Sequence, residues 1–126
     1  MNYEQMVERV YKLEFVENRD MADSMIKAVL GTLASRMKSA QAHRFSDDLP
    51  EPLNYGNLRS HQAHVTNITI DQFYGGLCTQ FKIDQDQAKK LVQTVLHCAK
   101  DAQPAEEIIV WEQGLPSEWA PLIENA

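Results

Sequence analysis

The sequence predicts an all-α protein, a helical bundle of two pseudo-repeats. Three observations predict it: a similar helix-start pattern opens each half, apolar residues recur at helical spacing in both halves, and each half ends near a Leu-Pro pair. We expect each pseudo-repeat to hold two longer helices, a short helix and a Leu-Pro turn. The chain is expected to form a single domain, 1–126, with pseudo-repeat 1 at 1–55, a connector at 56–67 and pseudo-repeat 2 at 68–126.

The opening helix of each half starts with the pattern of a capping box. Asn2 and Thr69 are each followed, three positions on, by Gln. In such a pair each side chain accepts a hydrogen bond from the backbone N–H of the other residue. These signals predict helices at 3–14 and 70–81.

Two adjacent glycines, Gly75 and Gly76, interrupt the second of these helices. Two glycines inside a helix cost about 1–2 kcal/mol relative to alanine, so the pair needs a structural reason. We expect a close helix crossing where no side chain would fit. A hinge or the floor of a groove is the alternative.

The longer second helix of each half carries an apolar stripe at positions i, i+4, i+7 and i+11. The stripe consists of Ala22, Ile26, Val29 and Leu33 in the first half, and of Ala88, Val92, Val95 and Ala99 in the second. With Asn18 and Asp84 as start signals, the pattern predicts helices at 19–38 and 85–101.

A short helix and a proline-opened turn complete each half. We place these elements at 40–48 and 50–55 in the first half, and at 104–114 and 117–123 in the second. Phe45 and Trp111 occupy matching positions and are expected to anchor the core. The segment 108–111 is rich in β-branched residues and a strand is the alternative there. We predict a helix, because the matching segment 42–45 lacks strand character.

The two halves differ most clearly at Ile108, Ile109 and Val110, which replace Ala, His and Arg of the first half. A polar face has therefore become apolar. We expect these residues to pack against the other half, since two copies must be joined somewhere. An exposed patch for a partner is the alternative.

The order of these elements resembles a known family. A capped opening helix, a long helix containing the Val-Leu-x-x-Leu pattern at 29–33, a short helix and a Leu-Pro pair, all in tandem, resemble the bacterial and archaeal proteins catalogued as domain of unknown function 2267. The resemblance covers essentially the whole chain and implies an all-helical cytoplasmic protein. It implies no catalytic or binding residue. The second half departs from the pattern at Ala99, where the family has leucine.

The charge and hydropathy of the chain exclude some classes of partner. The formal net charge is −6, so we expect no nucleic acid, because an acidic protein repels phosphate backbones. We expect no membrane partner either, because no apolar run approaches the roughly 20 residues that span a bilayer. The N-terminus does not have the pattern of a signal peptide, and we expect a cytoplasmic location.

The candidate reactive residues form no recognisable catalytic motif. Cys78 and Cys98 fit no zinc-binding spacing, and we expect both to be reduced and inert, with a disulfide as the alternative. His61 and His64 have a spacing that could bind a metal on a helix, but they lie in the predicted connector with no third ligand in evidence. We therefore predict no catalytic, cofactor-binding or metal-binding residue and no cofactor. An enzyme whose site no motif reveals stays an alternative to a non-catalytic protein.

These observations favour a non-catalytic helical interaction or regulatory module. Its expected partner is another protein or a second copy of the chain, held in a groove between helices. The alternative is the binding of a small apolar ligand or a metal in an inter-helix cavity close to His97, Cys98 and Cys78.

Overall fold

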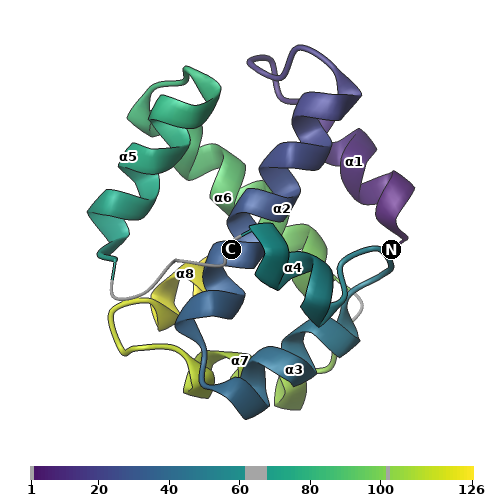
Figure 1. Cartoon of the computed structure of the whole chain (residues 1–126), viewed down its shortest axis with the longest axis vertical. Helices are drawn as coiled ribbons and strands as arrows, with labels where there is room; N and C mark the ends of the chain where they lie inside the picture. Colours follow the sequence, from purple (N-terminus) through teal and green to yellow (C-terminus); the bar gives the residue numbers. More distant parts are fainter. Residues whose placement is uncertain (1, 62–67, 102) are drawn as a thin grey trace.

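The computed structural model of the chain describes residues 2–61, 68–101 and 103–126. These residues form eight helices and no strand, arranged as in Figure 1. In chain order the helices are α1 Tyr3–Tyr11, α2 Arg19–Arg36, α3 Ser39–Asp48, α4 Tyr55–His61, α5 Ile70–Phe81, α6 Gln85–Lys100, α7 Ala105–Gly114 and α8 Ala120–Glu124. The predicted all-α class is confirmed, and the segment 108–111 is helical.

The predicted helix starts rest on real hydrogen bonds. Asn2 Oδ1 accepts from the backbone N–H of Gln5 at 2.9 Å, and Gln5 Oε1 accepts from the backbone N–H of Asn2 at 3.0 Å. Thr69 at α5 and Asp84 at α6 form the same capping box with the Gln three positions on. Asn18 caps α2 with a single bond of 2.8 Å. Each cap satisfies N–H groups that have no partner inside the helix.

The longest helices, α2 and α6, pack against each other, and one or both of them contact α1, α3, α4, α5 and α8. Helix α7 packs against α3 and α8. The first helix, α1, contacts both α2 and α6, and α5 likewise contacts both α6 and α2. Figure 1 shows the pairs α1–α2 and α5–α6 side by side, with α3, α7 and α8 at the opposite end of the molecule. Most pairs of helices that are in contact correspond to a second pair, formed by the matching helices of the other half, that is also in contact. A duplicated unit requires this correspondence. The duplication and its limits, 1–55 and 68–126, stay predictions.

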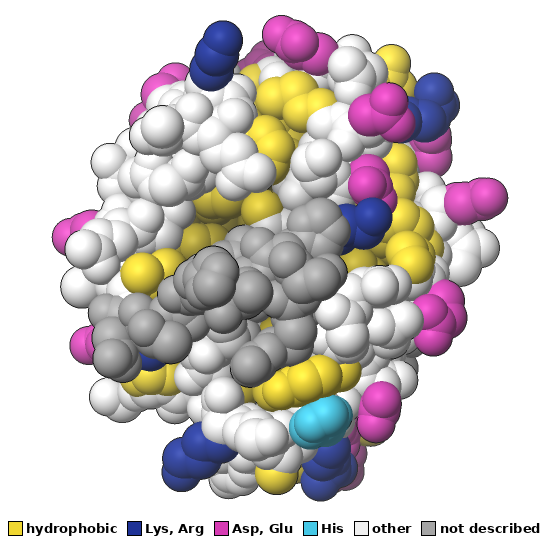
Figure 2. Space-filling view, in the orientation of Figure 1, with side chains coloured by type: hydrophobic (Ala, Val, Ile, Leu, Met, Phe, Trp, Pro, Cys, Tyr) yellow, Lys and Arg dark blue, Asp and Glu magenta, His cyan; other side chains and the backbone are white. Residues whose placement is uncertain are grey.

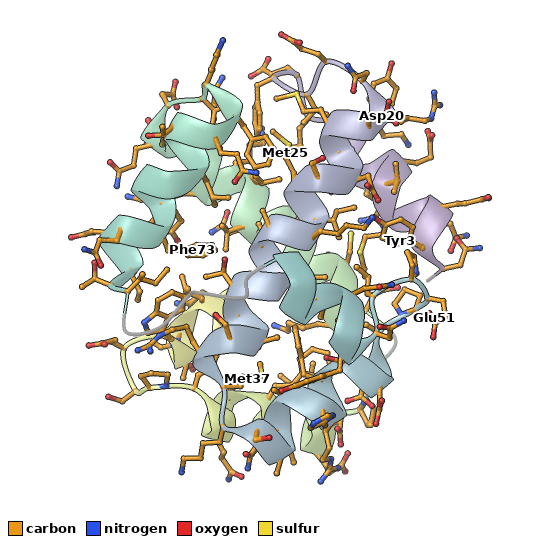
Figure 3. All side chains as sticks on the ribbon, viewed as in Figure 1. Tyr3, Asp20, Met25, Met37, Glu51 and Phe73 are labelled. Atoms are coloured by element: carbon orange, nitrogen blue, oxygen red, sulfur yellow. The ribbon has the colours of Figure 1, made fainter. Side chains whose placement is uncertain are left out.

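One continuous cluster of apolar side chains forms the core. Helix α2 is buried on almost every side, because it contacts α1, α3, α4, α5 and α6. Met25 on α2 and Phe73 on α5, labelled in Figure 3, are 0% and 3% exposed. Burial of this apolar surface is the main source of the stability of the fold.

Each predicted Leu-Pro turn is present and closes on the core. The backbone N–H of Leu53 donates to the carbonyl of Pro50 at 2.9 Å, and that of Trp119 donates to the carbonyl of Pro116 at 2.9 Å. The side chains of Leu53 and Trp119 are both 0% exposed. Proline stops the preceding helix, and the tight turn folds the next apolar residue inward.

The segment predicted to connect the two halves, 56–67, begins inside a helix, because α4 spans Tyr55–His61. Asn54 starts this helix by accepting a hydrogen bond from the backbone N–H of Asn57 at 2.9 Å. Leu58 anchors the helix to the core at 1% exposure. A helix of seven residues with so few apolar positions gives no readable periodicity. The remainder of the predicted connector, 62–67, lies outside the described residues.

Candidate functional site

A cleft lies where the α1–α2 loop faces the α5–α6 loop, at one end of the molecule. It encloses about 490 Å³, within the range of sites that bind small molecules or single side chains. Figure 2 shows apolar side chains in the space between these two helix pairs. We call this site the tip cleft, and its lining is Phe15, Glu17, Asn18, Met21, Gln80, Phe81, Lys82, Ile83 and Gln87.

The apolar part of the tip cleft comes from both helix pairs. Phe15, Met21 and Phe81 are each partly exposed while packing against the core. Ile83 closes the base at 8% exposure. Because these apolar side chains are packed against the core and still partly exposed, a partner can contact them without any unfolding of the protein.

The backbone conformation of the α5–α6 loop positions the residues that line the second side of the cleft. Lys82 ends α5 in the left-handed conformation, with φ 57° and ψ 49°, which is uncommon for a residue with a side chain. The backbone N–H groups of Lys82 and Ile83 both donate to the carbonyl of Cys78. This tight end turns the chain sharply and returns Ile83 to the core.

A second apolar groove, of about 440 Å³, runs along α1 beside Tyr3 and Val7. Three of its polar groups, Tyr3, Glu8 and Arg19, are already paired. Arg19 Nε bonds to Glu8 Oε1 at 2.5 Å, and the Tyr3 hydroxyl donates to Asp23, which also pairs with a lysine on α2. Burial, followed by the hydrogen bond to Asp23, raises the pKa of Tyr3. This closed network holds α1 to α2.

The first and second halves also meet at a joint between α3 and α7. Phe45 and Trp111, both 0% exposed, pack edge to face with ring centroids 4.8 Å apart. Their predicted role as core anchors is therefore confirmed. Edge-to-face aromatic pairs add about 0.5–1.5 kcal/mol beyond the burial of their surface.

Two hydrogen bonds close the joint at its ends. The backbone N–H of Lys38 donates to the carbonyl of Gly114 at 2.9 Å. At the other end, Gln103 Nε2 donates to the carbonyl of Asp48 at 2.9 Å. At the spacing that relates Phe45 to Trp111, the residue that matches Lys38 is Pro104, which has no N–H. The side chain of the preceding residue, Gln103, supplies the donor instead.

Acidic and basic side chains line the edge of this joint. Arg44 Nε donates to Glu107 Oε2 at 3.2 Å, and Trp111 Nε1 donates to Asp48 Oδ2 at 2.9 Å. Burial and a hydrogen bond with Glu107 raise the pKa of Asp48 to about 6. The same hydrogen bond, followed by the Arg44 interaction, lowers the pKa of Glu107. Of this pair, Asp48 is therefore the first to take up a proton as the pH falls.

The structure separates the three apolar residues predicted to form a surface. Ile108 is partly buried and packs against the core, whereas Ile109 is 50% exposed and Val110 is partly exposed. The contacts of α7 with α3 described above come from Glu107, Trp111 and Gly114 instead. A partner surface at Ile109 stays a prediction.

The predicted close helix crossing is not found at Gly75 and Gly76. Both are exposed, and a Cβ atom added to either would meet no atom within 4 Å. Gly76 lines a small groove between α5 and α2, of about 140 Å³. The close approach lies instead at Gly114, where an added Cβ would come within 2.5 Å of Gln41 Cβ.

The candidate ligand residues do not converge on one cavity. Cys98 is buried, and burial raises the pKa of its thiol, whereas its neighbour His97 is exposed. Both Cys78 and Cys98 are free thiols. His61 ends α4 and His64 lies outside the described residues. In the described part of the chain, no three His, Cys, Asp or Glu residues are placed to hold one metal ion.

The sequence contains a signal for the tip cleft that motif searching missed. Phe15 and Phe81 occupy matching positions in the two halves. Phe15 directly follows the predicted helix 3–14, and Phe81 is the last residue of the predicted helix 70–81. Aromatic residues at such places are exposed unless another element covers them. Comparison of loop residues, rather than of helix stripes, could have indicated this site.

Comparison with known proteins bears on the family of the chain. No helix in the described segments combines the length and the apolar character needed to cross a bilayer. No curated protein matches the chain, and no solved structure matches it. Residues 3–122 match the family described as Uncharacterized conserved protein (DUF2267). The match covers nearly the whole chain, and the protein therefore belongs to the DUF2267 family.

Proposed function

We propose that this protein is a non-catalytic interaction module that holds a segment of another protein in the tip cleft. The observation that supports the proposal is the partial exposure of Phe15, Met21 and Phe81 on one cleft between two helix pairs. Partly exposed apolar side chains in a concave site are suited to receiving an apolar anchor of a partner.

The composition of the cleft favours a protein segment over a small metabolite. Its charged lining residues, Glu17 and Lys82, are exposed. Sites for small ligands more often place a few buried polar groups inside an apolar pocket. The alternative, a small apolar ligand in this cleft, requires a compound that binds mainly through the aromatic groups.

We also propose that the module acts as a tandem repeat in the bacterial cytoplasm. The two free thiols support a reducing compartment. The matching pairs of packed helices support the repeat.

Affinity capture with two matched variants tests the protein-binding function. Met21 is the third residue of α2, the position at which Gln completes the capping boxes of the other long helices. Met21→Gln therefore removes an apolar lining group while favouring the helix start. Ile109→Gln makes the same kind of change on the exposed side of α7, at the far end of the molecule. Because a partner surface at Ile109 is the competing prediction, loss of the partner with Ile109→Gln and not with Met21→Gln would place the binding site there instead.

A partner should be retained by the wild type and by Ile109→Gln but lost with Met21→Gln. Removal of an apolar anchor typically weakens binding by about tenfold or more. Equal retention by all three baits would contradict the role of the cleft. A metabolite that raises the melting temperature of the wild type and not of Met21→Gln, with no retained protein, would favour the small-ligand alternative.

A further inference from the structure

We infer that the tip cleft binds a partner segment in extended conformation, whose backbone carbonyls accept hydrogen bonds from the side-chain amides of Asn18 and Gln87. The inference rests on the proposed interaction function and specifies the chemistry of the partner. Both residues line the cleft. Asn18 caps α2 and Gln87 is the third residue of α6, so each half of the chain supplies one amide.

Capping hydrogen bonds fix the orientation of both amides. Asn18 Oδ1 accepts from the backbone N–H of Met21 at 2.8 Å. Gln87 Oε1 accepts from the backbone N–H of Asp84 at 3.0 Å, as one of the two bonds of the α6 capping box. Because the amide oxygen must face the donating N–H, the NH2 group of each side chain is left for another acceptor.

Both NH2 groups are open to a partner. In the described part of the chain neither has a hydrogen-bond acceptor. Asn18 is exposed and Gln87 is partly exposed. The α1 capping box, formed by Asn2 and Gln5, contains the same pair of amides but does not line the tip cleft. The amides at the cleft differ from that pair because exposed apolar side chains line the same cavity.

The polar lining of the cleft offers mainly hydrogen-bond donors. Lys82 adds an ammonium group to the two NH2 groups, Gln80 can both donate and accept, and Glu17 only accepts. With one acid and one base, the charges of the lining balance, so hydrogen bonding rather than charge distinguishes a suitable partner. Such a partner presents acceptors beside its apolar side chain.

Backbone carbonyls are the acceptors that accompany every side chain of a protein segment. An apolar residue has its own carbonyl on one side and the carbonyl of the preceding residue on the other. In a helix these carbonyls already accept from N–H groups of the same helix. In an extended segment they are free to bond to another protein, as in β-strand addition. The donors of the cleft therefore favour an extended segment over a helix.

NMR titration of the intact protein with two small probes tests the inference. N-acetyl-leucine methylamide carries an apolar side chain between two amide carbonyls, and N-acetyl-glycine methylamide carries the carbonyls alone. We expect the leucine probe to bind in about the millimolar range and the glycine probe to bind at least about tenfold more weakly. Side-chain NH2 groups give separate signals in nitrogen–proton correlation spectra. Those of Asn18 and Gln87 should shift on binding, whereas those of Asn2 and Gln5 should not.

Two substitutions remove the free donors and keep the caps. Asn18→Asp and Gln87→Glu retain the oxygen that accepts from the helix backbone and replace NH2 by a second oxygen. Each should weaken binding of the leucine probe by about tenfold without lowering the melting temperature. Asn18→Ser, which is uncharged and still caps the helix, should weaken it by about three- to tenfold and so separates donor loss from added charge. Asn2→Asp and Gln5→Glu make the same changes outside the cleft and should leave the affinity unchanged.

The outcomes separate this inference from the broader proposal. Unchanged affinity in Asn18→Asp and Gln87→Glu, equal binding of the two probes, or no binding up to about 20 mM would each overturn the inference. In the capture experiment, a partner lost with Met21→Gln but kept with the two amide variants would overturn it too, while leaving the interaction function in place. A partner lost with all three variants would support both. NH2 shifts that grow with protein concentration in the absence of a probe would identify a second copy of the chain as the occupant and overturn a separate partner.

Discussion

The substitution Gly114→Ala tests the joint between α3 and α7. An added Cβ would lie 2.5 Å from Gln41 Cβ and 2.9 Å from Gln41 Cγ. Non-bonded carbon atoms normally pack about 3.5–4.0 Å apart. Because Gln41 Cβ is fixed to the backbone of α3, rotation of the Gln side chain cannot relieve the closest contact. The two helices must therefore separate by about 1 Å.

The energetic effect has three parts. Overpacking costs about 1–3 kcal/mol, and separation also stretches the 2.9 Å hydrogen bond from Lys38 N–H to the Gly114 carbonyl, which contributes about 1 kcal/mol. The higher helix propensity of alanine offsets up to about 1 kcal/mol of this destabilisation. We therefore expect a net loss of about 2 kcal/mol, or a melting temperature lower by about 8 °C for a domain of this size.

Equilibrium unfolding in urea measures this loss. Trp111 and Trp119 are both fully buried, so their fluorescence follows global unfolding. The matched controls are Gly75→Ala and Gly76→Ala, which place the same methyl group in open space. Each control should stabilise the protein by about 0.5–1 kcal/mol.

The stability of Gly114→Ala can refute the close approach of α3 and α7. If Gly114→Ala is as stable as the wild type, or is stabilised like the two controls, α3 and α7 do not approach as closely as described. If both controls destabilise the protein by more than about 1 kcal/mol, side chains do not fit at these positions of α5. That result would support the predicted close helix crossing at Gly75 and Gly76.

Three further perturbations follow from individual side chains. Because the pKa of Asp48 is raised to about 6 from 3.8, the folded state binds an extra proton between these values and stability should fall as pH rises from about 4.5 to 6. Asp48→Asn should remove that slope and stabilise the protein at pH 7 by about 1 kcal/mol, a value reduced for solvent screening; an unchanged slope in a pH series of urea titrations would contradict the assignment. Lys82→Gly should raise stability by about 0.5–1 kcal/mol by removing the left-handed side-chain penalty, and a lower melting temperature would argue against that conformation. Ile109→Asp should change stability by less than about 0.5 kcal/mol because the side chain is half exposed; a large loss, seen by calorimetry or with altered sedimentation, would place Ile109 in an interface.

The parts of the fold that local chemistry determines were predictable from the sequence. The caps at Asn2, Thr69 and Asp84 depend on residues three positions apart, so the sequence alone contains the whole interaction. The same holds for the proline stops that fold Leu53 and Trp119 inward. Helix α1 ends at Tyr11 rather than at 14, because its last turn depends on how the loop packs.

The parts determined by tertiary contact were not predictable in this way. Gly114 ends a helix, so its sequence context suggests only a helix stop. Its approach to Gln41 depends on the position of α3, more than 60 residues earlier in the chain. Gly75 and Gly76 look more demanding in sequence but face open space. The tip cleft likewise depends on the placement of two loops, which no local pattern specifies.

The hydrogen bond from Trp111 to Asp48 gives the protein an internal optical indicator. Its indole N–H points at a carboxyl group that takes up a proton near pH 6, and protonation replaces an anionic acceptor by a neutral one. Trp119 Nε1 has no hydrogen-bond partner among the described atoms and lacks such a neighbour. A spectral change of the Trp111 emission near pH 6 would thus record the state of the α3–α7 joint in the unlabelled protein, with the Trp119 signal as a built-in reference.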